Sequence, residues 1–551
     1  MTRGLIVADD RLGELAAVAR AIVHQRLPRS SLVDALGRQS APVCGELRKA
    51  GRLICSGWEC QSNQWMSLCR LLQAFRNTEG NELLLSFCKS PRSVADAGAW
   101  RRAIANIQRG LAAYEIRLGQ HELRLSPFRV IAQNRPLEKT LTELLTRNGR
   151  KAAGPDALRG RQFDTEQFWI DLQSNSPAVR LFRGSRLVSL QAMTRCSVSG
   201  LEKLLSGYLA RAVQSDGRMV YLYHPSRGTE DQTRDNAIRQ WMATRALIHV
   251  CRRTNDELRP IVRRNIDYNL QAMYREDGDL GLILDGEKVK LGAVALAALA
   301  LAESPFADEY KAIVQRLSAT VSALWTESGQ FRTFYRPAHR NDCQNFYPGE
   351  ALLLWARLVA TGNDASLADR FWRSFEYYQR WHNANRNPAF IPWHTQAYWN
   401  VWQLTHDRRL ADAILEMNDW LLPVQQWESA PQPDCQGRFY DPHRPFGPPH
   451  ASSTGVYLEG LADAFALARE LGDARQDGYR LAIVRGLRSI AQLTFKDDVD
   501  MFYVTKRDRL RGGVRTTEYN NVVRIDNVQH CLMAIQKVLD VFTDTDFAAL
   551  S

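Results

Sequence analysis

From residue 196 to the C-terminus, the sequence alternates between two kinds of apolar segment with helical spacing. Segments of the first kind are amphipathic, whereas those of the second kind are apolar on most sides. The amphipathic segments are 199–213, 256–274, 306–325, 367–381, 409–422 and 473–493. Each of them precedes one of the apolar segments 236–250, 291–303, 349–360, 395–404, 454–471 and 528–541. Six alternations amount to an internal repeat, which constrains the fold more than any single motif.

Burial assigns the two kinds of segment to two layers. A helix that is apolar on most sides must be covered on most sides, whereas an amphipathic helix can face water. The apolar segments are therefore inner helices and the amphipathic ones outer helices. Six inner helices that are each reached by a return loop all run in one direction, and a closed ring leaves no end repeat uncovered. We predict an all-α (α/α)6 toroid over residues 196–551.

The loops that lead into the inner helices repeat a glycine turn followed by a large apolar residue. Glycine supplies the turn, and the apolar side chain anchors the loop on the barrel. Clear versions stand at 216–220, 277–281, 328–332 and 436–440, and partial versions at 387–391 and 498–503.

The first 150 residues mix helical and strand-like patterns and predict a separate α+β domain. Helical spacing occurs at 12–24 and 65–75, and strand-like runs occur at 43–55, 82–88 and 111–125. Glycine, proline and charge at 148–156 indicate a linker. Residues 151–195 are predicted to be a linker with a short mixed segment, which has strands at 179–183 and 186–190. The chain is thus a multidomain protein divided into 1–150, 151–195 and 196–551.

Composition narrows the class of partner. The formal net charge of +12 is spread along the chain and comes from arginine more than lysine, which favours an anionic partner. No basic run is interleaved with aromatic residues, which argues against nucleic acid. Acidic residues interrupt the N-terminus where a signal peptide would be apolar, and the longest apolar run, 291–302, is too short to span a bilayer. We expect a cytoplasmic protein without membrane contact.

The ten cysteines follow no repeating spacing, so no disulfide framework, metal site or cofactor is predicted. A zinc site would require Cys343, Cys435 and Cys531, from three different repeats, to converge, and their spacing does not favour it.

The candidate site follows from the ring. Six parallel inner helices bring six N-termini to one mouth, where free N–H groups and helix dipoles favour an anionic ligand. Polar and aromatic residues gather in sequence at these helix starts. The candidates for catalysis are Asp235, Glu350, His394, His450 and Asp526. The candidates for substrate binding are Tyr223, Arg239, Asn345, Tyr347, Trp393, Tyr457, Arg515, Asn520, Arg524 and His530.

Helix capping is an alternative role for some of these residues. Asp235 and Asp526 are good N-caps, and Glu350 in a first turn also favours the helix dipole. The expectation from the repeat is that Asp235, Tyr347, His394, His450 and Asp526 lie at the same end of the ring and line one cavity.

The ring resembles the six-hairpin toroid superfamily of sugar-active proteins, which includes N-acylglucosamine 2-epimerases, glucuronyl C5-epimerases and several glycoside hydrolase families. The phrase Gln344-Asn-Phe-Tyr-Pro-Gly-Glu-Ala-Leu-Leu-Leu354 is similar to the proline-glycine start of an inner helix in uronate epimerases. This resemblance covers about 350 residues and implies an enzyme that acts on a saccharide, in particular an acidic one. A fainter resemblance, at 51–55 and from 106–111 to 126–128, links the N-terminal part to the AMMECR family, whose Arg-Gly-Cys-Ile-Gly core is absent here.

Two reactions fit these residues. A hydrolase needs two carboxylic acids, for which Asp235, Glu350 and Asp526 can provide a pair. An epimerase needs a base on each face of the reacting carbon, for which His394, His450 or a tyrosine serves. The alternative function is a non-catalytic ring that binds an anionic polymer or a partner protein. The sequence leaves the substrate and the oligomeric state open.

Overall fold

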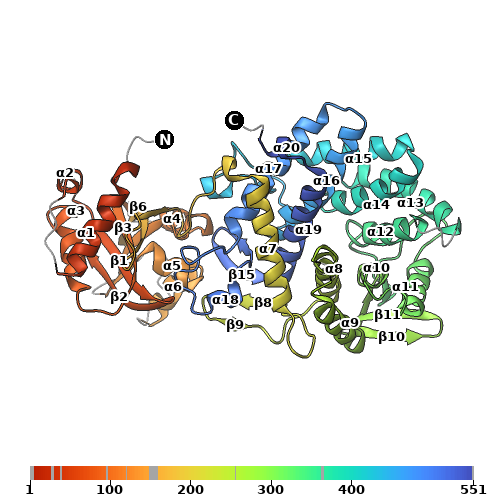
Figure 1. Ribbon diagram of the computed structural model, residues 1–551, viewed down its shortest axis with the longest axis horizontal. Coiled ribbons are helices and arrows are strands. Elements are labelled where there is room, and N and C mark those ends of the chain that lie inside the picture. Colours follow the sequence, from red (N-terminus) through yellow and green to blue (C-terminus); the bar gives the residue numbers. More distant parts are fainter. Residues whose placement is uncertain are drawn as a thin grey trace.

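The structure is a computed structural model that describes residues 5–25, 30–37, 40–94, 97–118, 121–147, 159–254, 256–360 and 365–548. The linker predicted at 148–156 lies outside these residues. Figure 1 shows an elongated molecule, with a sheet at one end and paired helices at the other.

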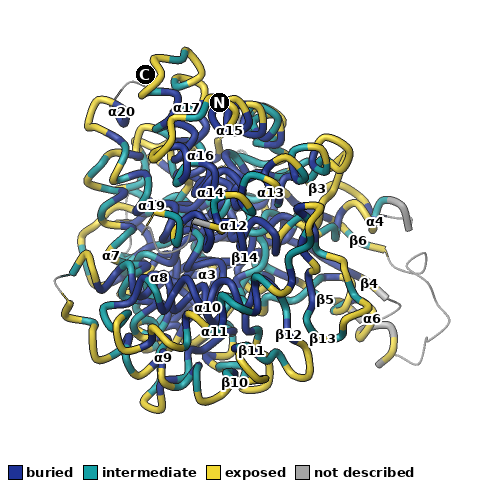
Figure 2. Tube along the Cα trace, turned by 90° about the vertical axis from the view of Figure 1, so that its right-hand side faces the viewer, coloured by how far each residue is buried: buried dark blue, intermediate teal, exposed yellow. Residues whose placement is uncertain are grey.

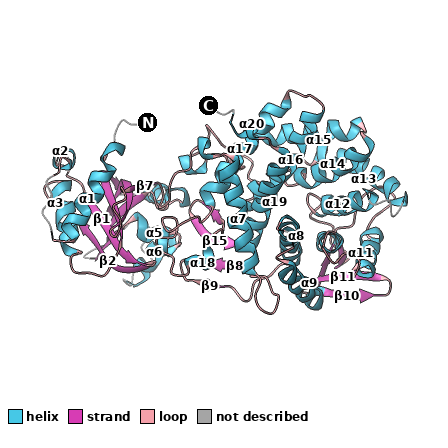
Figure 3. Ribbon diagram, in the orientation of Figure 1, coloured by secondary structure: helices cyan, strands magenta, loops and turns pink. Residues whose placement is uncertain are grey.

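Within the described residues, seven antiparallel strands form the sheet near the N-terminus. They are β1 Val43–Lys49, β2 Arg52–Glu59, β3 Glu82–Val94, β4 Ala112–Leu118, β5 His121–Leu125, β6 Arg159–Asp171 and β7 Val179–Leu181. The order is β2-β1-β3-β6-β4-β5, and β7 pairs with β6. Helices α1 (Leu12–Val23) and α3 (Gln64–Ala74) share an apolar core with this sheet. The strands are the magenta arrows in Figure 3.

The sheet extends past the boundary predicted at residue 150. Strand β6 lies between β3 and β4, in the segment 151–195 that we expected to be a linker with a short mixed segment. Both edges of β6 are paired, and many of its side chains are buried. Its sequence is nonetheless rich in polar residues, which hid its strand character. Residues 186–190 are not a strand. The remaining limits of the domain division stay a prediction.

Short helices complete this part of the chain and its C-terminal end. They are α2 Leu32–Leu36, α4 Ala97–Ala103, α5 Pro127–Gln133, α6 Leu137–Arg147, α18 Arg507–Leu510 and α20 Asp544–Ala548.

Paired helices form the rest of the described chain and follow the predicted alternation. The outer helices are α7 Arg195–Ala212, α9 Arg259–Met273, α11 Lys311–Ala323, α13 Ala365–Ala384, α15 Arg408–Leu421 and α17 Arg475–Leu493. The inner helices are α8 Ala237–Arg253, α10 Leu291–Ala302, α12 Tyr347–Ala360, α14 Ile391–Thr405, α16 Ala451–Glu470 and α19 Ile525–Val541. Consecutive inner helices pack on each other, and α19 packs on α8, so the ring closes. Figure 2 shows inner helices such as α10, α12 and α14 in the dark blue of buried residues.

Glycines bring the first turns of neighbouring inner helices close together. A Cβ added at Gly349 in α12 would lie 2.6 Å from Trp393 Cβ and 2.8 Å from His394 Nδ1 in α14. One added at Gly455 in α16 would lie 2.6 Å from Cys531 N in α19. In both contacts the N-terminal turns of one inner helix touch the N-terminal turns of its neighbour. These neighbouring inner helices therefore run parallel, as predicted. Among the described residues, no helix is long and apolar enough to cross a membrane.

The glycine turns of the loops connect each repeat to the next. Four of them have φ between 85° and 94° and close against a backbone carbonyl of the following outer helix. The pairs are Gly217 with Arg264, Gly329 with Arg373, Gly437 with Arg485, and Gly512 with Leu204. The last pair joins the final loop to the first outer helix. The sixth turn therefore lies at Gly512, and our assignment to 498–503 was wrong because an insertion precedes the turn.

We predicted an all-α ring, but the helical part also contains strands. Its loops form two four-stranded sheets within the described residues. One contains β10 Tyr274–Asp277, β11 Leu280–Asp285, β12 Lys288–Lys290 and β13 Phe334–Arg336; the other contains β14 Arg515–Thr517, β15 Asn520–Arg524, β8 Leu222–His224 and β9 Thr229–Glu230. Both sheets use extended segments that lead into inner helices. Their pairing satisfies backbone groups that a plain loop would leave to solvent.

The insertion before Gly512 docks the N-terminal sheet on the ring. Phe502 packs edge-on against Phe128 with ring centroids 5.7 Å apart. Arg507 Nη2 lies 2.6 Å from Glu82 Oε1. These contacts place the sheet on the side of the ring where the inner helices begin.

The glycine turn gives a direct test of the repeat. Gly437→Ala is expected to destabilise the ring by about 1–3 kcal/mol, because alanine at a φ of +90° is strained and its Cβ would meet the Arg485 carbonyl. Gly478→Ala, in the exposed first turns of α17, should be neutral or stabilising by about 0.5–1 kcal/mol. Thermal melting of the two variants measures the difference. Equal melting temperatures would contradict this role of the turn.

Candidate functional site

Asp526 is the centre of an ion-pair cluster at the start of the inner helices. It lies in the first turn of α19 and is 4% exposed. Arg524 Nε donates to its Oδ1 at 2.9 Å, and Arg524 Nη2 contacts Oδ2. Arg239, in the first turn of α8, places Nε 3.2 Å from Oδ2. Burial by itself raises the pKa of Asp526, but the hydrogen bond from Arg524 and the charge of Arg239 outweigh it and hold this pKa below its ordinary value.

His450 lies beside this cluster, at the N-cap of α16. Burial and then the positive charge of Arg524 lower its pKa to about 4, against the opposite effect of Asp526. The imidazole is therefore neutral at pH 7. Tyr221 adds its hydroxyl, which accepts a hydrogen bond from Arg239.

A histidine and a buried glutamate form a second element one turn deeper. His530 Nδ1 lies 2.8 Å from Oε1 of Glu459, whose side chain is 0% exposed. In this arrangement Nδ1–H donates to the carboxyl oxygen, which leaves Nε2 as an acceptor. The indole of Trp393 lies edge-on to this imidazole, at 6.1 Å between ring centroids. The negative charge of Asp526 and the His530 imidazole also interact.

These residues come from inner helices α8, α14, α16 and α19 and from the segments before them. We call them the cup cluster: Tyr221, Arg239, Trp393, His450, Glu459, Arg524, Asp526 and His530. Two guanidinium groups share Asp526, so the upper part of the cluster keeps a positive charge. Helix N-termini reinforce that charge, and the arrangement suits an anion.

Glu350 lies in the first turn of α12, in a second group near α10. It is 3% exposed and packs against Gly292, and its Oε2 has no hydrogen-bond partner among the described residues. Burial raises its pKa to about 8, and the nearby charge of Lys290 only partly opposes this. The carboxyl group is therefore largely protonated at pH 7. Tyr347, one turn earlier, also packs against Gly292 and lies edge-on to Phe334.

His394 is placed between two helix layers, outside the cup cluster. It is 0% exposed and stacks on Phe390, with ring centroids 3.5 Å apart. Tyr378 of outer helix α13 lies 5.6 Å from it, centroid to centroid. Burial lowers its pKa to about 3, so the ring is neutral. The geometry therefore gives His394 a packing role, because its position in the first turn of α14 faces the outer layer.

The other predicted site residues are dispersed. Asp235 is exposed and accepts from Asn236 N and Gln240 Nε2, both at 2.7 Å, but the N-cap of α8 is Asn236, whose side chain accepts from Arg239 N. Tyr223 is buried beneath Arg509, whose guanidinium carbon lies 5.2 Å from the ring. Tyr457 packs edge-on against Phe439. Asn345 is half-buried.

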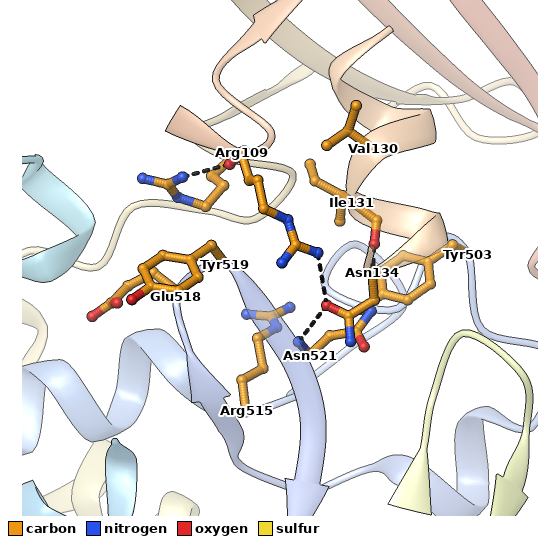
Figure 4. A pocket seen from close by; sticks show the side chains of 10 residues that line it. Arg109, Val130, Ile131, Asn134, Tyr503, Arg515, Glu518, Tyr519 and Asn521 are labelled. Carbon is orange, nitrogen blue, oxygen red and sulfur yellow. Dashed lines mark hydrogen bonds between the residues drawn. The ribbon is translucent and has the colours of Figure 1, made fainter. Parts of the chain in front are cut away.

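Arg515 and Asn520 lie at the contact between the ring and the N-terminal sheet. Asn520 Oδ1 accepts from Asn134 Nδ2 at 3.1 Å. Arg515 lines a pocket there, drawn in Figure 4. Contacts among the described residues thus group the candidates into the cup cluster, the Glu350 group and this junction. The single cavity expected for Asp235, Tyr347, His394, His450 and Asp526 stays a prediction.

Glu459 was missed by the sequence reasoning. It lies more than two turns inside α16, whereas we considered only helix starts. Its signal was an acidic residue which, like Asp463, stands among the apolar residues in the middle of an inner segment. Among the described residues, no group of three or more His, Cys, Asp or Glu side chains is arranged to hold a metal ion.

Comparison with known proteins found no matching family model and no matching curated protein. Solved structures similar to this chain include the alpha-1,6-mannanase GH76A from Salegentibacter sp. HEL1_6, at 12% identity, over 63% of this chain and 100% of that chain, with a TM-score of 0.44. An unsaturated glucuronyl hydrolase specific for heparin matches at 11% identity, over 62% of this chain and 97% of its own, with a TM-score of 0.45. An uncharacterised protein from Pyrococcus horikoshii matches at 13% identity over 32% of this chain and 99% of its own, with a TM-score of 0.26. These values assign no family to the chain.

The protonation of Glu350 is testable. A carboxyl whose folded pKa is raised stabilises the fold fully below its unfolded pKa of about 4.5, and this contribution is lost as pH rises through about 8. The melting temperature of the wild type should therefore fall relative to that of Glu350→Gln between pH 5 and 8, since glutamine cannot ionise. Parallel melting profiles would show that Glu350 does not titrate in this range.

Proposed function

We propose that the cup cluster is the anion-binding and proton-transfer site of an enzyme that acts on an acidic saccharide. The observation that carries this proposal is the Glu459–His530 pair, which lies beside the Arg239–Asp526–Arg524 group. The first pair supplies a base, and the second group supplies positive charge.

His530 is the residue we assign to proton transfer. A buried carboxylate that accepts from Nδ1–H fixes the tautomer and orientation of the imidazole and stabilises the imidazolium that forms. Nε2 is then free to take a proton from a substrate. The side chain of His530 is 13% exposed while that of Glu459 is 0% exposed, which matches an imidazole at the surface and a carboxylate behind it.

Arg239 and Arg524 are the residues we assign to the substrate carboxylate. Guanidinium groups bind carboxylates through paired hydrogen bonds. Asp526 holds both groups in place and neutralises only one of the two charges. His450 is neutral beside them and adds no competing negative charge.

The reaction that these groups support best begins with removal, by His530, of the proton on the carbon next to a uronate carboxylate. It ends with delivery of a proton to the opposite face of that carbon by the protonated carboxyl group of Glu350, on another wall of the ring, and proton exchange with solvent restores both groups. Binding the carboxylate between arginines stabilises the negative charge that develops on it. Glu350, protonated at pH 7, supports hydrolysis as the second candidate reaction, because a glycosidase needs an acid of raised pKa.

The proposal predicts that His530→Gln and Glu459→Gln lose turnover on uronate-containing oligosaccharides. Removal of a general base typically lowers kcat by about 10²–10⁴-fold. Incubation in deuterated water, followed by mass spectrometry and NMR, reports both deuterium uptake at the carbon next to the carboxylate and cleavage of the glycosidic bond.

His443→Gln is the matched control, because His443 is exposed in the loop before α16 and should leave turnover unchanged. Binding without exchange or cleavage would support the alternative of a non-catalytic binding ring. Turnover that survives in both His530→Gln and Glu459→Gln would contradict the assigned base.

Anion binding is tested separately with Arg524→Met. Loss of a charge-assisted contact should weaken glucuronate binding by about 2–5 kcal/mol, while Asp526 keeps its contact with Arg239. Calorimetric titration measures binding, and thermal melting measures stability. Arg234→Met removes the same charge from an exposed position and is the control. A large fall in the melting temperature of Arg524→Met with unchanged glucuronate affinity would contradict the binding role. Arg524 would then only stabilise the fold through its ion pair with Asp526.

A further inference from the structure

A small pocket lies between the N-terminal sheet and the ring, apart from the cup cluster. Its walls come from both sides: Arg109, Val130, Ile131, Asn134 and Arg183 from the N-terminal part, and Tyr503, Arg515, Glu518, Tyr519 and Asn521 from the ring. Figure 4 shows the Arg109 and Arg515 side chains reaching toward the space between these walls. The volume of the pocket is about 20 Å³.

Arg109 is buried in this pocket without a matching acid. It is 5% exposed, and Nη2 donates to Asn134 Oδ1 at 3.2 Å. Among the described residues, its Nε has no hydrogen-bond partner, and no carboxylate lies within 4.0 Å of the guanidinium. Burial and the like charge of Arg183 lower its pKa to about 10, so it remains charged at neutral pH.

Arg515 faces the pocket from the other side in a similar state. It is 7% exposed and stacks its guanidinium 4.2 Å from the centre of the Phe495 ring. Nη1 donates to the Gln492 carbonyl at 3.3 Å and Nη2 to the Asp500 carbonyl at 3.1 Å. Carbonyl groups solvate a guanidinium but do not neutralise it, and no ion pair of Arg515 occurs in the described part of the chain.

The acids around the pocket are already engaged. Asp434 Oδ2 accepts from Arg183 Nε at 2.6 Å. Glu518 Oε2 accepts from Arg438 Nη1 at 2.8 Å. Each of these acids neutralises its own arginine, so the charges of Arg109 and Arg515 stay uncompensated. A buried charge without a counter-charge costs several kcal/mol, and an anion placed between the two arginines removes that cost.

We infer that this pocket binds one small oxyanion group, of the phosphate, sulfate or carboxylate class, between the sheet and the ring. The small volume excludes a sugar ring. The amide NH2 groups of Asn134 and Asn521 already donate to protein groups, so the two guanidinium groups supply the contacts to the anion. The site is distinct from the proposed saccharide site and does not depend on it.

The position of the pocket gives the anion a structural consequence. Asn134 Oδ1 accepts from both Arg109 Nη2 and the Asn521 backbone N, the latter at 3.1 Å, so the two walls already meet at this amide. An oxyanion between Arg109 and Arg515 adds a second bridge between the N-terminal part and the ring. Bound anion should therefore raise the stability of the whole chain.

The experiment uses inorganic phosphate as the probe with the full-length chain. Thermal melting is followed as sodium phosphate replaces sodium chloride at constant ionic strength, and isothermal titration measures the phosphate affinity. We expect a saturable rise in melting temperature and one binding site per chain. Parallel titrations with sulfate and acetate distinguish a tetrahedral oxyanion from a carboxylate.

Arg109→Met is expected to weaken phosphate binding by about tenfold or more, since a charge-assisted contact is lost. In phosphate-free buffer this variant should melt no lower than the wild type, because an uncompensated buried charge has been removed. Arg515→Met repeats the test from the ring side. Arg102→Met, an exposed arginine in α4, is the control and should keep wild-type affinity.

A wild type that melts at the same temperature in phosphate and in chloride would overturn the inference. Unchanged affinity in Arg109→Met would overturn it as well. Arg524→Met should keep the phosphate response, which separates this site from the cup cluster.

Discussion

Closure of the helical ring is the constraint on which the rest of the structure depends. Six inner helices cannot be covered by outer helices alone, so each must also pack against two inner neighbours. The last contact, α19 on α8, joins segments that are almost three hundred positions apart in the chain. Gly512 completes the same closure in the outer layer by packing against Leu204 of α7. The Arg239–Asp526 ion pair bridges this closure, so the candidate site assembles only in the closed ring.

The interior of the ring carries charge as well as apolar contacts. Arg245 of α8 pairs with Glu303 at the end of α10, and Lys537 of α19 pairs with Asp463 of α16. Glu459 and Asp463 of α16, across the ring, add to the effect of Glu303 in raising the pKa of Arg245. Buried ion pairs contribute little net stability but are costly to break. These ion pairs therefore determine which inner helices face one another, and they place Glu459 among other charged side chains.

Helical periodicity was enough to predict the order of inner and outer helices, because burial on all sides leaves a clear compositional signal. It was not enough to place the side chains. His394 and Asp526 both lie in the first turn of an inner helix, yet the His394 side chain faces the outer layer and that of Asp526 faces the cup cluster. The position of a residue along a helix does not determine the direction of its side chain. Glu459 lies deeper than the helix starts that were considered. The sixth glycine turn was misplaced because the insertion before it has apolar residues of its own, which pack against the N-terminal sheet.

Glu350 and Glu459 show how one ring can hold two carboxyl groups in different surroundings. Both are buried in inner helices, and α14 separates their helices. Glu459 has a histidine at 2.8 Å, whereas Glu350 has only the weak influence of Lys290, and burial raises its pKa to about 8. A proton donor on one wall and a histidine supported by a carboxylate on another are what acid–base chemistry on a ligand between them requires. A proton donor and a base on the same helix could not act in this way, because the two groups must approach the ligand from two sides. The ring geometry supplies those two sides, so the parallel arrangement of inner helices underlies both the fold and the chemistry that we propose for it.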